Sequence, residues 1–171
     1  GAGVFSVGGE GSITRWDREN GRSVESFQLS NQSLRAIAFS EKRNELAVGG
    51  SDCAIYLLDA ETLSLKQVLK NAHGNSICTG AYTPNQQYLL SGARDALLKV
   101  WHSPQPAPSE YSLFAGTPEF PAHLFTINHI VFSPDGGLFA TANRDKTLKI
   151  WDARSFELLK VIDTIRFGGH I

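Results

Sequence analysis

The sequence predicts an all-β fold of repeated four-stranded antiparallel sheets, and three observations support this prediction. Segments 91–101 and 141–151 align without a gap, each with a hydroxyl residue, then an aspartate, then a tryptophan. The same frame recurs from Ser6 and Val48, so successive frames (6, 48, 91, 141) begin 42, 43 and 50 residues apart. The apolar residues show no helical periodicity. A period of about 40–45 residues with four strands each is typical of the blades of a β-propeller.

Each unit starts with an apolar run that ends in an aromatic residue, and this run predicts the first strand. The runs are SLRAIAF at 33–39, SICTGAY at 76–82 and TINHIVF at 126–132. A turn follows each run, at 40–44, 83–87 and 133–137. In these turns Pro, Asn, Asp and Gly supply the fixed or positive φ that tight hairpins need. The second strands are then predicted at 45–48, 88–91 and 138–141.

The second half of each unit contains two more strands. A turn that carries an aspartate precedes each third strand, and the third strands are predicted at 53–59, 97–102 and 147–152. Fourth strands follow as LKQVL at 65–69, EYSLF at 110–114 and ELLKVI at 157–162. Short strands bounded by turn residues in this order form an antiparallel meander.

The composition is that of an ordinary soluble globular protein. With 171 residues, 42% of them hydrophobic and 19% charged, the chain has room for one sizeable core. The net charge of −1 and interspersed charges predict no nucleic-acid or membrane partner. No signal peptide is visible, so a cytoplasmic location is expected. Cys53 and Cys78 have no Cys or His at metal-ligand spacing, so no cofactor is expected. Two reduced buried thiols are expected, with a disulfide between them as the alternative.

These features resemble the WD-repeat family of β-propellers. The resemblance spans the whole chain. It depends on the aspartate of each second turn, on two histidines and on four Trp-Asp-like pairs: His73, His123, Trp16-Asp17, Trp151-Asp152, and the degenerate Trp101-His102 and Leu58-Asp59. The resemblance implies that the His, Ser or Thr, Asp and Trp of a blade form one buried hydrogen-bonded chain. The two complete sets are His73–Ser91–Asp95–Trp101 and His123–Thr141–Asp145–Trp151.

A hydroxyl, an imidazole and a carboxylate are also the components of a catalytic triad. This alternative is disfavoured because the set occurs twice, with Ser in one copy and Thr in the other. The set is also incomplete in other frames, where Val48 replaces the hydroxyl residue and Glu10 replaces the aspartate. No GxSxG-type nucleophile motif is present. We therefore interpret both sets as structural and expect no catalytic residues and no enzymatic activity.

The repeat frame also predicts the division of the chain. The expected organisation is a single partial propeller domain over 1–171, with complete blades at 30–72, 73–122 and 123–169. An incomplete blade of three strands is expected at 1–29, and the start of a further blade at 170–171. Because propellers of this family commonly close with seven blades, we expect about half of a longer propeller. Its remaining half, or a second copy, is expected to cover the terminal blades.

The most plausible function is a non-catalytic scaffold that binds a protein or peptide through loops of the propeller. The alternative is an enzyme or small-ligand binder at the central channel, where only Arg35, Asn128 and His129 are candidates.

A partner-binding patch is hypothesised where the aspartate-bearing turns meet the loops between blades. It comprises Arg94, Arg144, Phe120 and Phe125, since Arg and aromatic residues are enriched at interfaces. The competing interpretation is that the arginines only cap their turns and that the phenylalanines pack between blades.

Overall fold

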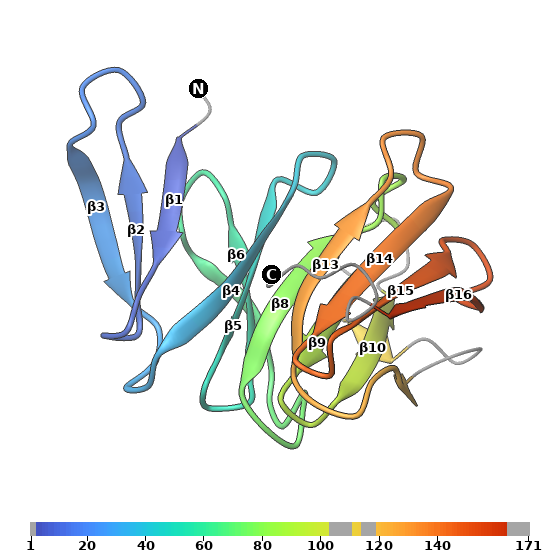
Figure 1. Ribbon diagram of the computed structural model, residues 1–171. Helices are drawn as coiled ribbons and strands as arrows, with labels where there is room; N and C mark the ends of the chain where they lie inside the picture. The colour runs from blue at the N-terminus through green and yellow to red at the C-terminus, as the bar shows by residue number, and fades with distance from the viewer. Residues whose placement is uncertain (1–2, 103–110, 114–118, 164–171) are drawn as a thin grey trace.

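The computed structural model describes residues 3–102, 111–113 and 119–163, which form sixteen β-strands in four antiparallel sheets. Within these ranges there is no helix, and therefore none long and apolar enough to cross a membrane. The sheets stand side by side in chain order, with the innermost strand of each beside that of the next (Figure 1). This arrangement confirms the predicted fold class, a partial β-propeller.

The first sheet has three strands and the second has four. The strands of the first sheet are β1 (Val4–Val7), β2 (Ser12–Trp16) and β3 (Ser23–Gln28). Those of the second are β4 (Leu34–Ser40), β5 (Glu45–Gly50), β6 (Ile55–Asp59) and β7 (Leu65–Leu69). Each sheet is a simple meander in which consecutive strands pair, as the short turns between the predicted strands require.

The third and fourth sheets repeat this order. The third contains β8 (Ile77–Tyr82), β9 (Tyr88–Ala93), β10 (Leu97–His102), β11 (Ser112–Leu113) and β12 (Glu119–Pro121). The fourth contains β13 (Ile127–Phe132), β14 (Leu138–Asn143), β15 (Thr147–Asp152) and β16 (Leu158–Asp163).

The outer edge of the third sheet differs from the sequence-based prediction of a single fourth strand at 110–114. Two short strands share this edge, because β11 pairs with the end of β10 at Trp101 and His102. The second short strand, β12, pairs with Leu97, Leu98 and Lys99 at the start of β10. The extra length of this unit therefore divides one outer strand into two.

The aspartate that follows the tryptophan position shapes the turn between the third and fourth strands. Asp152 Oδ1 accepts hydrogen bonds from the backbone amides of Arg154 and Ser155, at 2.9 and 2.8 Å. Asp17 and Asp59 accept two amide hydrogen bonds each in the same way. The Trp-Asp pairs thus end one strand with a buried or half-buried side chain and begin the next turn with an Asx-type bond.

The apolar core lies in layers between neighbouring sheets. One layer joins Ala47 and Leu57 of the second sheet to Leu89 and Trp101 of the third. At the inner end of these layers the sheets approach closely at glycines. A Cβ on Gly49 would lie 2.6 Å from Ile77 Cγ2, and one on Gly92 would lie 2.7 Å from Ile127 Cγ2. Only a residue without a Cβ permits this spacing.

Candidate functional site

The residues singled out from the sequence lie at one end of the sheets, which we call the aspartate-turn face. This face comprises the turns 8–11, 51–54, 94–96 and 144–146 and the loops that lead into β4, β8 and β13. Loops and turns are joined by backbone hydrogen bonds, such as His73 N to Cys53 O at 3.3 Å and Arg94 N to Ser76 O at 3.0 Å. Each loop is therefore fastened to a turn of a neighbouring strand pair.

The first complete set forms a continuous chain of hydrogen bonds in the third sheet. The indole Nε1 of Trp101 donates to Ser91 Oγ at 2.8 Å, and Ser91 Oγ lies 2.7 Å from His73 Nε2. His73 Nδ1 lies 3.0 Å from Asp95 Oδ2. A proton on Nδ1 satisfies all of these contacts, since Nδ1 then donates to the carboxylate and Nε2 accepts from the hydroxyl.

The second complete set repeats this geometry in the fourth sheet. Trp151 Nε1 donates to Thr141 Oγ1 at 2.9 Å, and Thr141 Oγ1 lies 2.7 Å from His123 Nε2. His123 Nδ1 lies 3.1 Å from Asp145 Oδ2. The methyl group that distinguishes Thr from Ser changes none of these contacts, which explains why the two copies can differ in this residue.

The chemistry of both sets is that of a buried structural connection. Ser91 and Thr141 are 1% and 0% exposed, so neither hydroxyl can reach a substrate. Burial of the imidazole holds the pKa of His123 below its usual value, although the Asp145 carboxylate acts in the opposite direction. Burial alone would raise the pKa of Asp95, but the interaction with His73 and the hydrogen bonds from the amides of Leu97 and Gly74 together lower that pKa.

The other two sheets carry altered versions of the set. In the first sheet, Trp16 Nε1 donates to Ser6 Oγ at 2.7 Å. In the second, Asp52 Oδ2 accepts from Ser30 Oγ at 2.5 Å and from Tyr56 OH at 2.6 Å. Sequence reasoning missed both donors to Asp52. The signal for Ser30 is its spacing, because it precedes Asp52 by 22 residues, the interval that separates His73 from Asp95.

The structure separates the four residues of the hypothesised patch. Arg94 and Arg144 are exposed, and Phe125 is 59% exposed in the loop before β13. Phe120 instead packs between sheets, with its ring centroid 5.1 Å from that of Trp151. Only three of the four side chains are therefore available on the aspartate-turn face.

Sequence reasoning also missed Leu124, the neighbour of Phe125, which is 82% exposed. Its backbone amide donates to Asp145 Oδ2 at 3.4 Å, and Asn143 Nδ2 donates to Phe125 O at 2.7 Å. Both bonds tie the loop to the turn that carries Arg144. The signal that could have revealed this pair is its position in the sequence, because two apolar residues directly follow His123 in a loop between blades.

The three candidate channel residues are exposed. Arg35 Nε donates to Ser51 Oγ at 3.0 Å, and Asn128 and His129 point from β13 into exposed positions. Among the described residues, no group of three His, Cys, Asp or Glu side chains is arranged to hold a metal ion.

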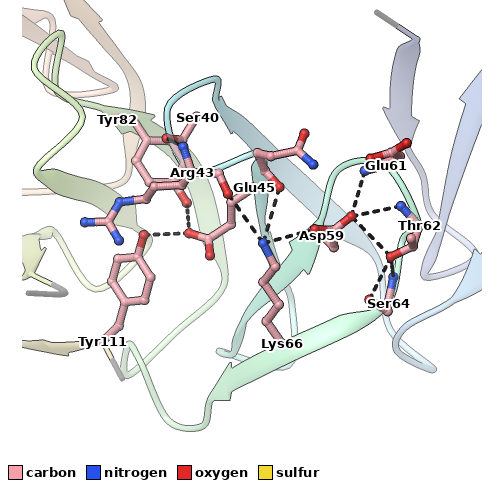
Figure 2. Close-up of polar contacts among 11 residues, drawn as sticks. Ser40, Arg43, Glu45, Asp59, Glu61, Thr62, Ser64, Lys66, Tyr82 and Tyr111 are labelled. Carbon is pink, nitrogen blue, oxygen red and sulfur yellow. Dashed lines mark hydrogen bonds and ion pairs between the residues drawn. The ribbon is translucent and has the colours of Figure 1, made fainter. Parts of the chain in front are cut away.

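A separate polar cluster at the opposite end of the strands joins the second and third sheets (Figure 2). Glu45 is 7% exposed, and its Oε1 accepts from Tyr82 OH at 2.8 Å and from Tyr111 OH at 2.6 Å. Burial, with the Glu45 carboxylate as a further cause, raises the pKa of both phenols. The guanidinium of Arg43 lies 5.2 Å from the centre of the Tyr111 ring. This cluster fixes the second sheet against the third.

Comparison with known proteins identifies the repeats. The family model "WD domain, G-beta repeat" matches residues 64–102 and 116–152. The chain is 26% identical over 151 residues to WD repeat-containing protein SL1-17 of Schistosoma mansoni, which covers 88% of this chain and 46% of that protein. It is 26% identical over 177 aligned residues to eukaryotic translation initiation factor 3 subunit I of Bombyx mori, covering 95% of this chain and 50% of that protein.

A third relative is nuclear distribution protein nudF 1 of Talaromyces marneffei, 27% identical over 139 residues. That alignment covers 80% of this chain and 28% of the fungal protein. The chain therefore spans half or less of the length of these curated relatives.

Proposed function

Because this chain belongs to the WD-repeat family, we propose that it is a non-catalytic scaffold that binds a protein or peptide through its aspartate-turn face. The observation that carries the proposal is the exposure of Arg94, Arg144 and Phe125 on loops with an ordered base. Asp95 and Asp145, each next to one of these arginines, are held by buried histidines. Turns and loops that are held in place and that present Arg and apolar side chains match the composition of protein interfaces.

The alternative function, an enzyme or small-ligand binder at the central channel, has less support. Ser91 and Thr141 are buried within their own sheets and already take part in two hydrogen bonds each. A nucleophile has to be exposed beside donors that stabilise the developing charge.

The proposal is tested by partner capture with matched arginine variants. Arg94→Ala and Arg144→Ala should each reduce the partner recovered from cell extract and leave the unfolding midpoint nearly unchanged, because both side chains are exposed. Arg154→Ala is the control, since this exposed arginine lies in the β15–β16 turn at the opposite end of the sheet. Equal losses for all three variants, or unchanged capture by the first two, would exclude the aspartate-turn face as the binding surface.

A further inference from the structure

We infer that the partner segment received by the aspartate-turn face is an extended acidic peptide with an apolar residue at one end. This inference rests on the proposed function and specifies the chemistry of its partner. Carboxylates of the peptide would pair with Arg35, Arg94 and Arg144, and its apolar side chain would cover Leu124 and Phe125. Three features of the described residues lead to this assignment.

The first feature is the unequal use of charges on this face. Within residues 3–102, 111–113 and 119–163, no hydrogen bond or ion pair engages the side chains of Arg94 and Arg144. The carboxylates next to them are turned inward and already used. Asp95 accepts from His73, Gly74 N and Leu97 N. In these turns the arginine side chain is therefore exposed to solvent, and the aspartate carboxylate is occupied by hydrogen bonds within the protein.

The carboxylate of the fourth sheet is used in the same way. Asp145 Oδ1 accepts from the amide of Thr147 at 2.9 Å and from its hydroxyl at 2.5 Å, while Oδ2 faces His123 and the amide of Leu124. No oxygen of Asp145 remains turned toward Arg144. A carboxylate from outside the chain is the complementary ligand for such a guanidinium, because it can accept two parallel N–H bonds.

The second feature is that three consecutive sheets each place one arginine on the aspartate-turn face, and we call these three arginines the basic rim. Arg35 lies at a register shift at the start of the inner strand β4, between Leu34 and Ala36. Its Nε bond to Ser51 places it beside the turn position equivalent to Arg94, since Ser51 N and Arg94 N donate to the equivalent carbonyls of Ser33 and Ser76. The second, third and fourth sheets thus each contribute one guanidinium. The first sheet carries Glu10 in its turn, so the basic rim does not extend there.

The spacing of this rim suits an extended chain. Packed sheets lie about 10 Å apart, and an extended peptide advances about 3.3 Å per residue. Acidic side chains about three residues apart would therefore meet successive arginines. A helical peptide rises only about 1.5 Å per residue and would need about seven residues for the same step.

The third feature is the apolar pair at one end of the rim. Leu124 and Phe125 are 82% and 59% exposed, and the bonds from Asn143 and to Asp145 hold their loop beside Arg144. Exposed apolar side chains beside arginines favour a peptide over a nucleic acid. The net charge of −1 also opposes binding of a polyanion.

The test uses the full 171-residue chain and fluorescein-labelled synthetic 12-residue peptides in anisotropy titrations at two salt concentrations. The first probe has Glu at every third position and a terminal Leu. The second replaces each Glu with Gln, the third replaces the Leu with Ser, and a single-stranded oligonucleotide is the fourth. The first probe should bind best, and its affinity should fall as salt rises.

Arginine variants then locate the site. Arg35→Gln, Arg94→Gln and Arg144→Gln should each weaken the first probe about two- to fivefold, as expected for an exposed ion pair, and Arg154→Gln should not. Leu124→Ser should weaken the first probe but not the third. The inference is overturned if the Gln peptide or the oligonucleotide binds as well as the first probe, if no acidic probe binds, or if Arg154→Gln has the same effect.

The two proposals can fail separately. If capture from extract depends on Arg94 and Arg144 but the Glu-containing peptide binds no better than its Gln counterpart, the partner chemistry proposed here is wrong and the scaffold function stands. If capture does not depend on these arginines, the proposed function itself fails.

Discussion

Replacement of Asp145 by alanine should destabilise the protein substantially, because this carboxylate holds the histidine chain of the fourth sheet. The variant loses the acceptor of His123 Nδ1 at 3.1 Å and the acceptor of two bonds from Thr147, at 2.9 and 2.5 Å. His123 is 5% exposed, so water cannot readily replace the lost acceptor. Thr147 Oγ1, 3.3 Å from His123 Nδ1, is the remaining acceptor within reach.

The magnitude follows from these contacts. A buried donor left without a partner costs about 1–3 kcal/mol, and each net hydrogen bond contributes about 0.5–1.5 kcal/mol. We therefore expect Asp145→Ala to lower the free energy of unfolding by about 2–4 kcal/mol. For a chain of this length, about 2–4 °C of Tm is lost per kcal/mol, so the Tm should fall by on the order of 10 °C.

The assay is equilibrium unfolding in guanidinium chloride, followed by tryptophan fluorescence, with an unchanged m-value as the test of two-state behaviour. Asp145→Asn keeps one acceptor oxygen and should lie between the alanine variant and the parent. Asp135→Ala is the matched control, because Asp135 accepts from Ser133 and Gly137 in an exposed turn and its loss should destabilise the protein much less. The reasoning is refuted if Asp145→Ala is no more destabilising than Asp135→Ala.

Three further predictions follow from other features. The pKa of His123 is lowered in the folded state, so its stabilising contribution is complete above pH 6.5 and is lost as pH falls toward the folded pKa. Denaturant unfolding between pH 7 and 5 should show this loss of stability, and His123→Gln should remove the pH dependence. Glu45→Ala should cost about 2–4 kcal/mol because it leaves two buried phenols without an acceptor, whereas Tyr111→Phe should cost about 1–2 kcal/mol, both measured by thermal unfolding. Val131 and Leu138 are 60% and 40% exposed, and we expect this apolar face of the fourth sheet to associate with a second copy or another segment. Light scattering should show reduced association when both residues are replaced by Ser. A monodisperse monomer of the parent chain would contradict the prediction.

The sequence was sufficient to predict contacts that lie within one repeat. The spacing of 10 residues between Ser91 and Trp101 places these side chains on neighbouring strands of one sheet, and the spacing of 18 between His73 and Ser91 places the histidine in the loop that leads into the same sheet. Such contacts recur at fixed intervals because strand length and turn length recur. The fold class therefore follows from periodicity, and the members of both histidine chains follow from the resemblance to the WD-repeat family.

Contacts between repeats could not be predicted in this way. Tyr111 reaches Glu45 across 66 residues, from the outer edge of the third sheet to the second sheet. Phe120 lies in the short strand β12, and only the pairing of β12 with β10 turns its ring toward Trp151 and away from the surface. These positions depend on how two sheets meet, and the repeat frame carries no information about that.

The close approach at Gly49 and Gly92 gives the protein a fixed angular pitch between successive sheets. Each glycine lies near the hub, where an isoleucine of the next inner strand occupies the space of the missing methyl group. A methyl group added at Gly92 would act as a wedge near the axis and rotate the fourth sheet as one body. The displacement would grow with distance from the axis and be greatest at the outer strand. The absence of a side chain at Gly49 and Gly92 therefore affects the position of the outer strands, which lie far from either glycine.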